Sequence, residues 1–189
     1  MTTEARNLTA GVQRYGWVAM ILHWAVACMI VAQYFIAEAA EELPRGIAQI
    51  EMYALHKSMG ITVLLLALVR MGWRFIVPPP PPVVMAPWQA GASRMAHWGL
   101  YLLLLAMPLS GWLYSSAEAF SVSWWGLVQL PDLVGPSEEL ADLLHEVHEY
   151  GFLALVGLAG LHIAAALKHQ FIDRDGALMR MLPAMGRRS

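Results

Sequence analysis

The chain has 189 residues, of which 58% are hydrophobic and only 14% are charged. Soluble domains average about 45–50% apolar and about 25% charged residues, so this composition argues against an ordinary soluble globule. The formal net charge of −2 provides no basic field for gripping phosphates, which argues against a nucleic-acid-binding protein.

Four stretches of about twenty mostly apolar residues, the length that crosses about 30 Å of hydrocarbon, predict four membrane-spanning helices. In chain order they cover about residues 17–37, 52–73, 95–117 and 144–169. The third contains Pro108, which should kink it unless neighbours satisfy the carbonyl that proline leaves free. We therefore expect residues 1–189 to form one domain, an all-α integral membrane four-helix bundle.

A cleaved signal peptide is the alternative for the first stretch. Arg6 and Arg14 precede it, and Ala37-Glu38-Ala39 resembles a cleavage site. However, the stretch is longer than the usual apolar region of about 7–15 residues and contains a histidine, so we expect it to be retained.

Lysine and arginine divide the connections into two classes. Ten of the twelve precede the first stretch, lie around the connection between the second and third, or follow the fourth: Arg6, Arg14, Arg70, Arg74, Arg94, Lys168, Arg174, Arg180, Arg187 and Arg188. The other two connections carry only Arg45 and Lys57 against eleven acids: Glu38, Glu41, Glu42, Glu51, Glu118, Asp132, Glu138, Glu139, Asp142, Glu146 and Glu149. The positive-inside rule predicts that both termini are cytoplasmic, as an even number of crossings also requires.

Two connections have a distinctive composition. The unbroken proline run at residues 78–82 favours extended polyproline II structure and is best explained as a stiff spacer. Trp124 and Trp125 follow the third stretch, where we expect interfacial anchors or a short surface helix.

Most of the seven histidines fall at or inside the predicted spans, where an ionisable side chain is by default a functional candidate. His148 and His162 are fourteen residues apart, which is about 40° short of four turns and about 21 Å along the axis, so they share one helix face. By depth, His23 matches His162 near the inner ends, and His56 matches His148 near the outer ends. Two such pairs of imidazoles in an apolar bundle are what two bis-histidine haems need.

Other ionisable residues have weaker signals. Arg70 and Arg74 share a face at the inner end of the second helix, where they can pair with haem propionates or reach lipid phosphate. His97, near the inner surface, can hydrogen-bond a quinone carbonyl or a propionate, or it can be a simple interfacial residue. His145, one turn before His148, replaces it as a ligand if the helix begins earlier.

Cysteine chemistry is limited to Cys28, the only cysteine of the chain. One thiol excludes an intrachain disulfide framework, a multi-cysteine metal site and the paired thiols that attach c-type haem. Any metal site therefore has to rely on histidine.

Short motifs in all four stretches carry a family resemblance. They are Ile21-Leu22-His23-Trp24, Leu55-His56-Lys57-Ser58-Met59-Gly60, Ala96-His97, Ala106-Met107-Pro108-Leu109-Ser110-Gly111, His148-Glu149 and Gly160-Leu161-His162-Ile163-Ala164-Ala165-Ala166-Leu167-Lys168-His169, with the ending Leu178-Met179-Arg180-Met181-Leu182-Pro183. With these motifs the chain resembles the bacterial cytochrome b561 family, four-helix dihaem proteins related to the cytochrome b subunits of nickel–iron hydrogenases and formate dehydrogenases.

The resemblance implies a multi-pass protein of the bacterial inner membrane with two bis-histidine haem b groups. It implies that His23 and His162 bind the cytoplasmic-side haem, while His56 and His148 bind the periplasmic-side haem. It also implies electron transfer between a periplasmic-side donor and the ubiquinone pool, with superoxide as one candidate donor. Whether the chain is itself a superoxide–ubiquinone oxidoreductase stays open.

Two alternatives remain at this stage. The chain could be a membrane conduit or anchor for a separate periplasmic redox protein, with its acidic outer connections as a docking surface. A histidine-lined transporter without haem is the other class.

Overall fold

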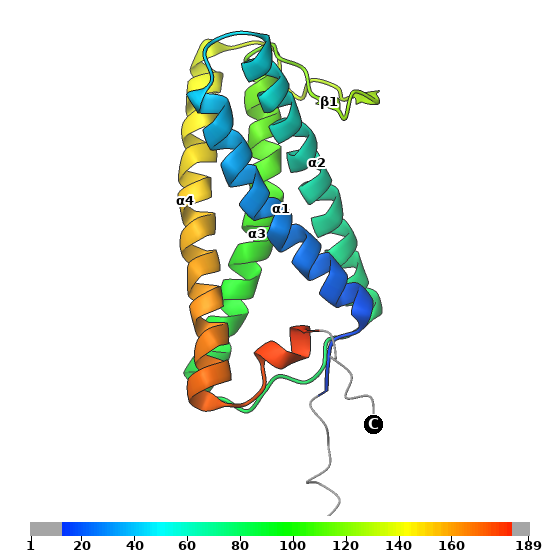
Figure 1. Ribbon diagram of the computed structural model, residues 1–189, viewed down its shortest axis with the longest axis vertical. Helices are drawn as coiled ribbons and strands as arrows, with labels where there is room; N and C mark the ends of the chain where they lie inside the picture. Colours follow the sequence, from blue (N-terminus) through cyan, green and yellow to red (C-terminus); the bar gives the residue numbers. More distant parts are fainter. Residues whose placement is uncertain (1–12, 183–189) are drawn as a thin grey trace, which may run out of the picture.

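A computed structural model describes residues 13–182 of the chain, and four long helices run side by side in it (Figure 1). They are α1 (Trp17–Glu42), α2 (Ile47–Ile76), α3 (Pro87–Ala117) and α4 (Glu138–Lys168). Each is long and apolar enough to cross a membrane. The prediction of an all-α integral membrane four-helix bundle is confirmed.

Every helix extends beyond the apolar stretch that predicts it at one end or both. α4 begins at Glu138, where the Ser137 hydroxyl accepts a hydrogen bond from the Leu140 amide (3.3 Å) and acids occupy the first turn. α3 begins at Pro87, a first-turn position that proline suits because its missing N–H is not needed there. Hydropathy alone cannot detect these polar terminal turns.

The bundle has few buried apolar side chains, among them Val26, Ile61, Leu64 and Leu155, whereas many large ones lie on its surface. Exposed examples on the spanning helices are Ile21, Phe35, Leu102, Leu153 and Ile163. Lipid solvates such side chains as well as a core does, so this distribution fits a bundle surrounded by hydrocarbon.

The backbone of α4 lies close to α3 over much of its length, and α1 lies close to α2. α4 has at most isolated close backbone approaches to α1 and α2. At the α3–α4 contact, glycines permit the approach: a Cβ on Gly99 would lie 2.7 Å from the side chain of Leu158, and one on Gly151 would lie 2.6 Å from Met107 Sδ. The bundle is therefore tight between α3 and α4 and more open where α4 faces the other two helices.

α3 continues through Pro108 as one uninterrupted helix to Ala117. It leads into a connection that contains a two-stranded antiparallel hairpin, β1 (Ser123–Trp124) and β2 (Val128–Gln129). Trp125 and Gly126 turn the chain with φ of 54° and 68°, the left-handed values typical of tight hairpins. The hairpin stands in place of the short surface helix that was one of the two expectations for Trp124 and Trp125, whereas their role as interfacial anchors stays a prediction.

The hairpin is fastened to α2 by polar groups. The indole nitrogens of Trp124 and Trp125 both donate to Thr62 Oγ1 (3.1 and 3.0 Å). The buried Ser58 hydroxyl accepts from the Trp125 amide (3.1 Å) and lies 3.1 Å from the Ser123 carbonyl oxygen. The tryptophans are therefore tied to the bundle by hydrogen bonds.

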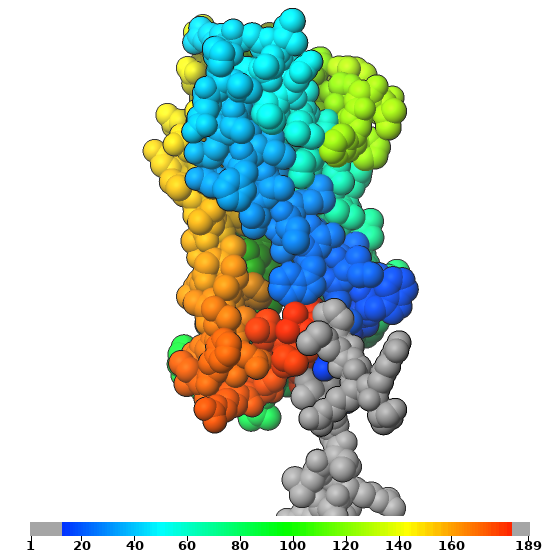
Figure 2. All heavy atoms as spheres, in the orientation of Figure 1, coloured from blue at the N-terminus to red at the C-terminus, as the bar shows by residue number. Residues whose placement is uncertain are grey.

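Beyond α4, η2 (His169–Asp173) is a turn of π-helix and η3 (Leu178–Met181) is a turn of 3-10 helix. η3 folds back under α1 (Figures 1 and 2). The Tyr15 amide donates to the Arg180 carbonyl (3.1 Å), and the Trp24 indole donates to the Met181 carbonyl (2.8 Å). Both ends of the described chain thus meet at one end of the bundle, called the terminal end below; the opposite end, with the hairpin, is the loop end.

Some residues used in the sequence analysis lie outside the described residues. They are Arg6, Pro183, Arg187 and Arg188.

Candidate metal centres between the helices

Two pairs of histidines face each other across the interior, one nearer each end of the bundle. At the loop end, the imidazole centres of His56 (α2) and His148 (α4) lie 6.3 Å apart with their planes at 74°. At the terminal end, those of His23 (α1) and His162 (α4) lie 6.4 Å apart with their planes at 78°. The structure thus brings together the same two pairs that helical depth suggests.

The spacing of each pair matches the space that one metal ion needs. A histidine nitrogen binds a metal at about 2.0 Å and lies about 1.1 Å from its ring centre, so two imidazoles on opposite sides of one ion have centres about 6.2 Å apart. The observed 6.3 and 6.4 Å agree with this value. Both pairs also span the contacts of α4 with α1 and α2, where close backbone approaches are few.

The hydrogen bond of His148 leaves its other nitrogen available to a metal. Ser110 Oγ lies 3.0 Å from His148 Nδ1 and donates its single hydrogen to the Met107 carbonyl (2.9 Å). When the hydroxyl donates to Met107, Nδ1 of His148 carries the proton and donates it to Ser110, which leaves Nε2 with a free lone pair. A neutral imidazole in this tautomer is what metal coordination requires.

His56 contrasts with its partner because its Nδ1 is buried and has no hydrogen-bond partner among the described residues. The Gln33 side chain of α1 packs beside it and donates from Nε2 to the His56 carbonyl (3.0 Å). A buried ring nitrogen without a partner is costly in an apolar protein. The spacing of both pairs and the tautomer of His148 make the four-histidine donor set fit a bound haem-type group.

His97 lies beside the pair at the terminal end. Its ring centre is 5.2 Å from that of His162, which is shorter than the separation within either histidine pair. His97 Nδ1 donates to the Ser93 carbonyl (2.6 Å), because a carbonyl oxygen can only accept. In the neutral ring, Nε2 is therefore an acceptor.

Arg70 and Arg74 line a cavity of about 440 Å³ at the terminal end, between the start of α1, the end of α2 and the proline run. Arg70 Nε donates to the Tyr101 hydroxyl (3.4 Å), whereas its Nη1 is buried and without a partner. The Trp73 indole N–H is likewise buried and unpaired among the described residues. Among the described residues, those lining the cavity include no carboxylate, so it suits an anionic group.

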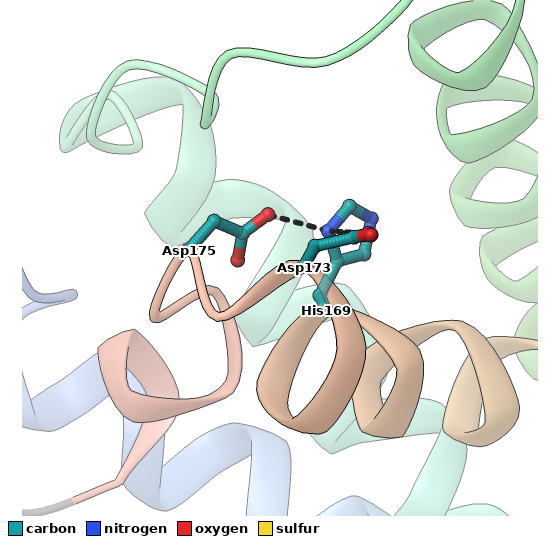
Figure 3. Close-up of side chains that lie close together, drawn as sticks. All are labelled: His169, Asp173 and Asp175. Carbon is teal, nitrogen blue, oxygen red and sulfur yellow. Dashed lines mark hydrogen bonds and ion pairs between the residues drawn. The ribbon is translucent and has the colours of Figure 1, made fainter.

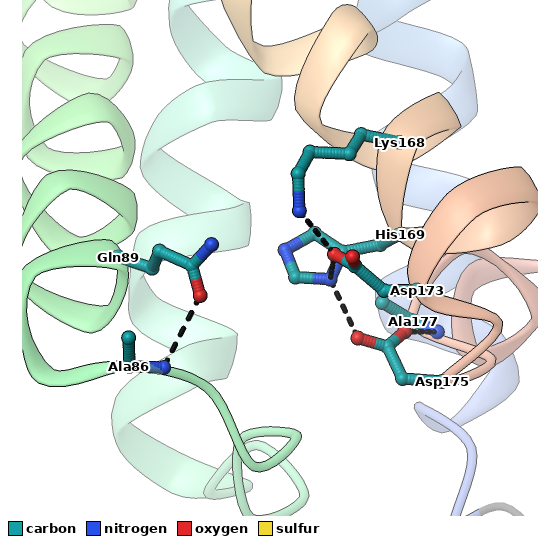
Figure 4. A network of polar contacts seen from close by, with 7 residues as sticks. All are labelled: Ala86, Gln89, Lys168, His169, Asp173, Asp175 and Ala177. Atoms are coloured by element: carbon teal, nitrogen blue, oxygen red, sulfur yellow. Dashed lines mark hydrogen bonds and ion pairs between the residues drawn. The ribbon is translucent and has the colours of Figure 1, made fainter.

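Two further histidines have different surroundings. His145 is exposed and packs edge-on against Tyr114, with ring centres 5.4 Å apart, while His148 faces the interior. His169 Nδ1 lies 2.5 Å from Asp175 Oδ2 and 3.3 Å from Asp173 Oδ2 at the end of α4 (Figure 3). Lys168 completes this cluster through an ion pair with Asp173. Figure 4 shows the cluster opposite Gln89, which belongs to α3.

Ser110, Gln33 and Tyr101 surround the candidate residues without having been singled out from the sequence. Gln33 offered a signal, since it is a strongly polar residue in a spanning stretch. Ser110 lies within the Pro108–Gly111 motif, but nothing in its spacing indicates that it faces His148. Contacts of this kind depend on how two helices are rotated about their axes.

Comparisons with known proteins show the family of the chain. A family model described as prokaryotic cytochrome b561 matches residues 14–184. Cytochrome b561 homolog 2 of Escherichia coli (strain K12) is 32% identical over 179 residues, which cover 90% of this chain and 92% of that protein. A probable superoxide oxidase CybB of Yersinia pestis is 30% identical over 181 residues, 90% of this chain and 97% of that one.

A third relative is cytochrome b562 of Cereibacter sphaeroides, 29% identical over 177 residues, with 89% of this chain and 94% of that protein covered. All these matches run across the four helices and the histidines described above. The chain is thus a member of the prokaryotic cytochrome b561 family: a multi-pass bacterial membrane protein that binds b-type haem and works in electron transfer.

Proposed function

We propose that the chain is a dihaem cytochrome that carries electrons between a periplasmic-side donor and ubiquinone in the bacterial inner membrane. The observation that carries this proposal is the pair of imidazole spacings, 6.3 Å at the loop end and 6.4 Å at the terminal end. His56 and His148 would hold one haem b, and His23 and His162 the other.

The excess of Lys and Arg at the terminal end supports a cytoplasmic position for that end. The His23–His162 site then lies toward the cytoplasm, and the His56–His148 site lies toward the periplasm. Their separation of about 21 Å along α4, for ligands fourteen positions apart, lets the two centres relay an electron across most of the hydrocarbon layer.

When bound, each haem supplies a reversible one-electron centre. Two histidines at each site would complete the ligands of its haem, and this would favour outer-sphere electron transfer over oxygen activation. The helices fix the distance between the sites and surround them with apolar side chains, which exclude water and tune the potentials.

Residues at the terminal end suit the quinone side of the reaction. Reduction of one quinone to its quinol takes two electrons and two protons, so the chain has to pass two electrons in succession. Arg70 and Arg74 would pair with the propionates of the haem near His23. His97 would lie at the quinone site, where its free Nε2 can accept a hydrogen bond from a hydroxyl of the quinol product.

A second candidate function is a conduit for a separate periplasmic redox protein. It is favoured by the loop end, where all eleven acids named above are exposed and none forms an ion pair with a described residue. Lys57 is one of only two basic residues there, and its Nζ donates a hydrogen bond to the Phe120 carbonyl (3.5 Å). Such a surface slows an anion such as superoxide and attracts a basic protein.

One assay distinguishes the two functions. The purified haem-loaded protein, with a ubiquinone analogue, is exposed to a steady superoxide source, and quinol formation is followed. Quinol formation by the protein alone supports a superoxide–ubiquinone oxidoreductase. Quinol formation only after a reduced basic electron-carrier protein is added, and lost at high salt, supports the conduit. Absence of b-type bands in a reduced-minus-oxidised spectrum contradicts both.

A further inference from the structure

Ser110 is a buried polar residue of α3 whose hydrogen bonds lead directly to His148. Its side chain is almost fully enclosed, with 6% of the residue exposed. Because the Met107 carbonyl takes the only hydroxyl hydrogen, the oxygen of Ser110 accepts from His148 Nδ1 at 3.0 Å. In this arrangement Nδ1 of His148 carries the proton and Nε2 does not.

Gly111 shapes the other side of this contact. A Cβ at this position would lie 3.0 Å from His148 Cε1 and 3.4 Å from Nδ1, so any larger residue would press on the ring. Ser110 and Gly111 together contact the His148 imidazole and hold it in one position.

The two histidines of the loop-end pair are therefore unequal. His148 Nδ1 has an acceptor, whereas the buried Nδ1 of His56 has none among the described residues. An acceptor at the distal N–H makes a ligating imidazole a stronger electron donor to its metal. Stronger donation stabilises the oxidised metal more than the reduced one and so lowers the reduction potential.

We propose that Ser110 is a positioning residue that fixes the tautomer of His148 and lowers the potential of the haem between His56 and His148. The inference rests on the proposed function, since it requires a haem at this pair. In this proposal α3 supplies no haem ligand, but it controls the reduction potential of the loop-end haem through Ser110.

The test compares Ser110→Ala and Ser110→Thr with the matched control Ser116→Ala in the purified haem-loaded protein. Ser116 is another buried serine of α3, and it donates to the Trp112 carbonyl (2.9 Å) without a histidine contact. Haem content is measured first, followed by potentiometric titration and electron paramagnetic resonance of the low-spin haems. The same titration in a His162→Ala background, which we expect to retain the loop-end haem alone, assigns the shifted component.

We expect Ser110→Ala to raise the loop-end potential and change its resonance signal while the terminal-end haem keeps both. Ser110→Thr, which restores the hydroxyl, should return the wild-type values, and Ser116→Ala should not depart from them. Loss of only the loop-end haem in Ser110→Ala, with recovery in Ser110→Thr, also supports the role.

Two results overturn the inference. One is a Ser110→Ala protein with two haems and an unchanged loop-end potential and signal; the other is an equal shift in Ser116→Ala. If the wild-type protein instead binds no haem at His56 and His148, the proposed function itself fails, and the haem content reveals this before any potential is measured.

Discussion

At the scale of single residues, His97 shows how one hydrogen bond limits the chemistry of a side chain. Its Nδ1–H is committed to the Ser93 carbonyl, so the neutral ring can only accept at Nε2. A quinol hydroxyl is a suitable donor for that nitrogen. A quinone carbonyl and a haem propionate only accept hydrogen bonds, so His97 could donate to either one only with a doubly protonated ring. The neutral ring is therefore restricted to a partner that donates.

We expect His97→Ala to keep both haems and to weaken quinone turnover. Loss of one hydrogen bond of about 0.5–1.5 kcal/mol corresponds to a decrease of roughly twofold to tenfold in kcat/KM for quinone. Pyridine haemochrome and steady-state kinetics measure the two quantities. His145→Ala, which removes an exposed histidine outside the pairs, is the control, and unchanged quinone kinetics in His97→Ala would end this assignment.

Residue positions were predictable from the sequence only along each helix. The fixed rise and turn of a helix place His148 and His162 on one face and match their depths to those of His56 and His23. The contact of Ser110 with His148, or of Arg70 with Tyr101, depends on the relative rotation of two helices. A single sequence contains no periodic signal for that rotation.

At the scale of elements, the α3–α4 contact brings Gly111 against the His148 ring. We expect Gly111→Ala to lower the occupancy of the loop-end haem, because the new methyl group displaces the imidazole. Haem per chain after purification measures this effect.

Gly157→Ala is the matched control on α4, since a Cβ there meets nothing within 4 Å. Alanine favours a helix over glycine by about 1 kcal/mol, so this variant should keep full haem content and gain stability. Equal haem content in the two variants would contradict the close approach at Gly111.

Ion pairs between side chains hold the end of α4. His169, Lys168 and two aspartates form a compact cluster around a turn of π-helix, and Asp175 Oδ1 also accepts from the Ala177 amide (2.9 Å). Asp175→Asn should loosen this turn, with faster hydrogen exchange over residues 169–177 and little change elsewhere. Asp132→Asn, at an exposed acid bonded to Ser121, is the control; unaltered exchange in Asp175→Asn would show that the cluster contributes nothing.

Hydropathy predicted four spans but not the hairpin at residues 123–129. Its strands have two residues each, and the polar anchors on Ser58 and Thr62 come from a different helix. Short elements held by distant side chains carry too little local pattern to be detected in a sequence.

At the scale of the whole molecule, charge differs between the two ends of the bundle. Basic residues gather at the terminal end and acids at the loop end, which predicts a cytoplasmic terminal end. We expect a C-terminal fusion of green fluorescent protein to fluoresce and a C-terminal alkaline phosphatase to be inactive. Phosphatase inserted after Gly126 of the hairpin should be active, and the opposite pattern would invert the proposed direction of the relay.

The central claim is that α4 shares one haem with α1 and another with α2. Pyridine haemochrome quantification against protein concentration tests it most directly, in the wild type and in His162→Ala. The account predicts two haem b groups per wild-type chain and one in His162→Ala, with His145→Ala unchanged at two. One haem or none in the wild type, or two in His162→Ala, would contradict it.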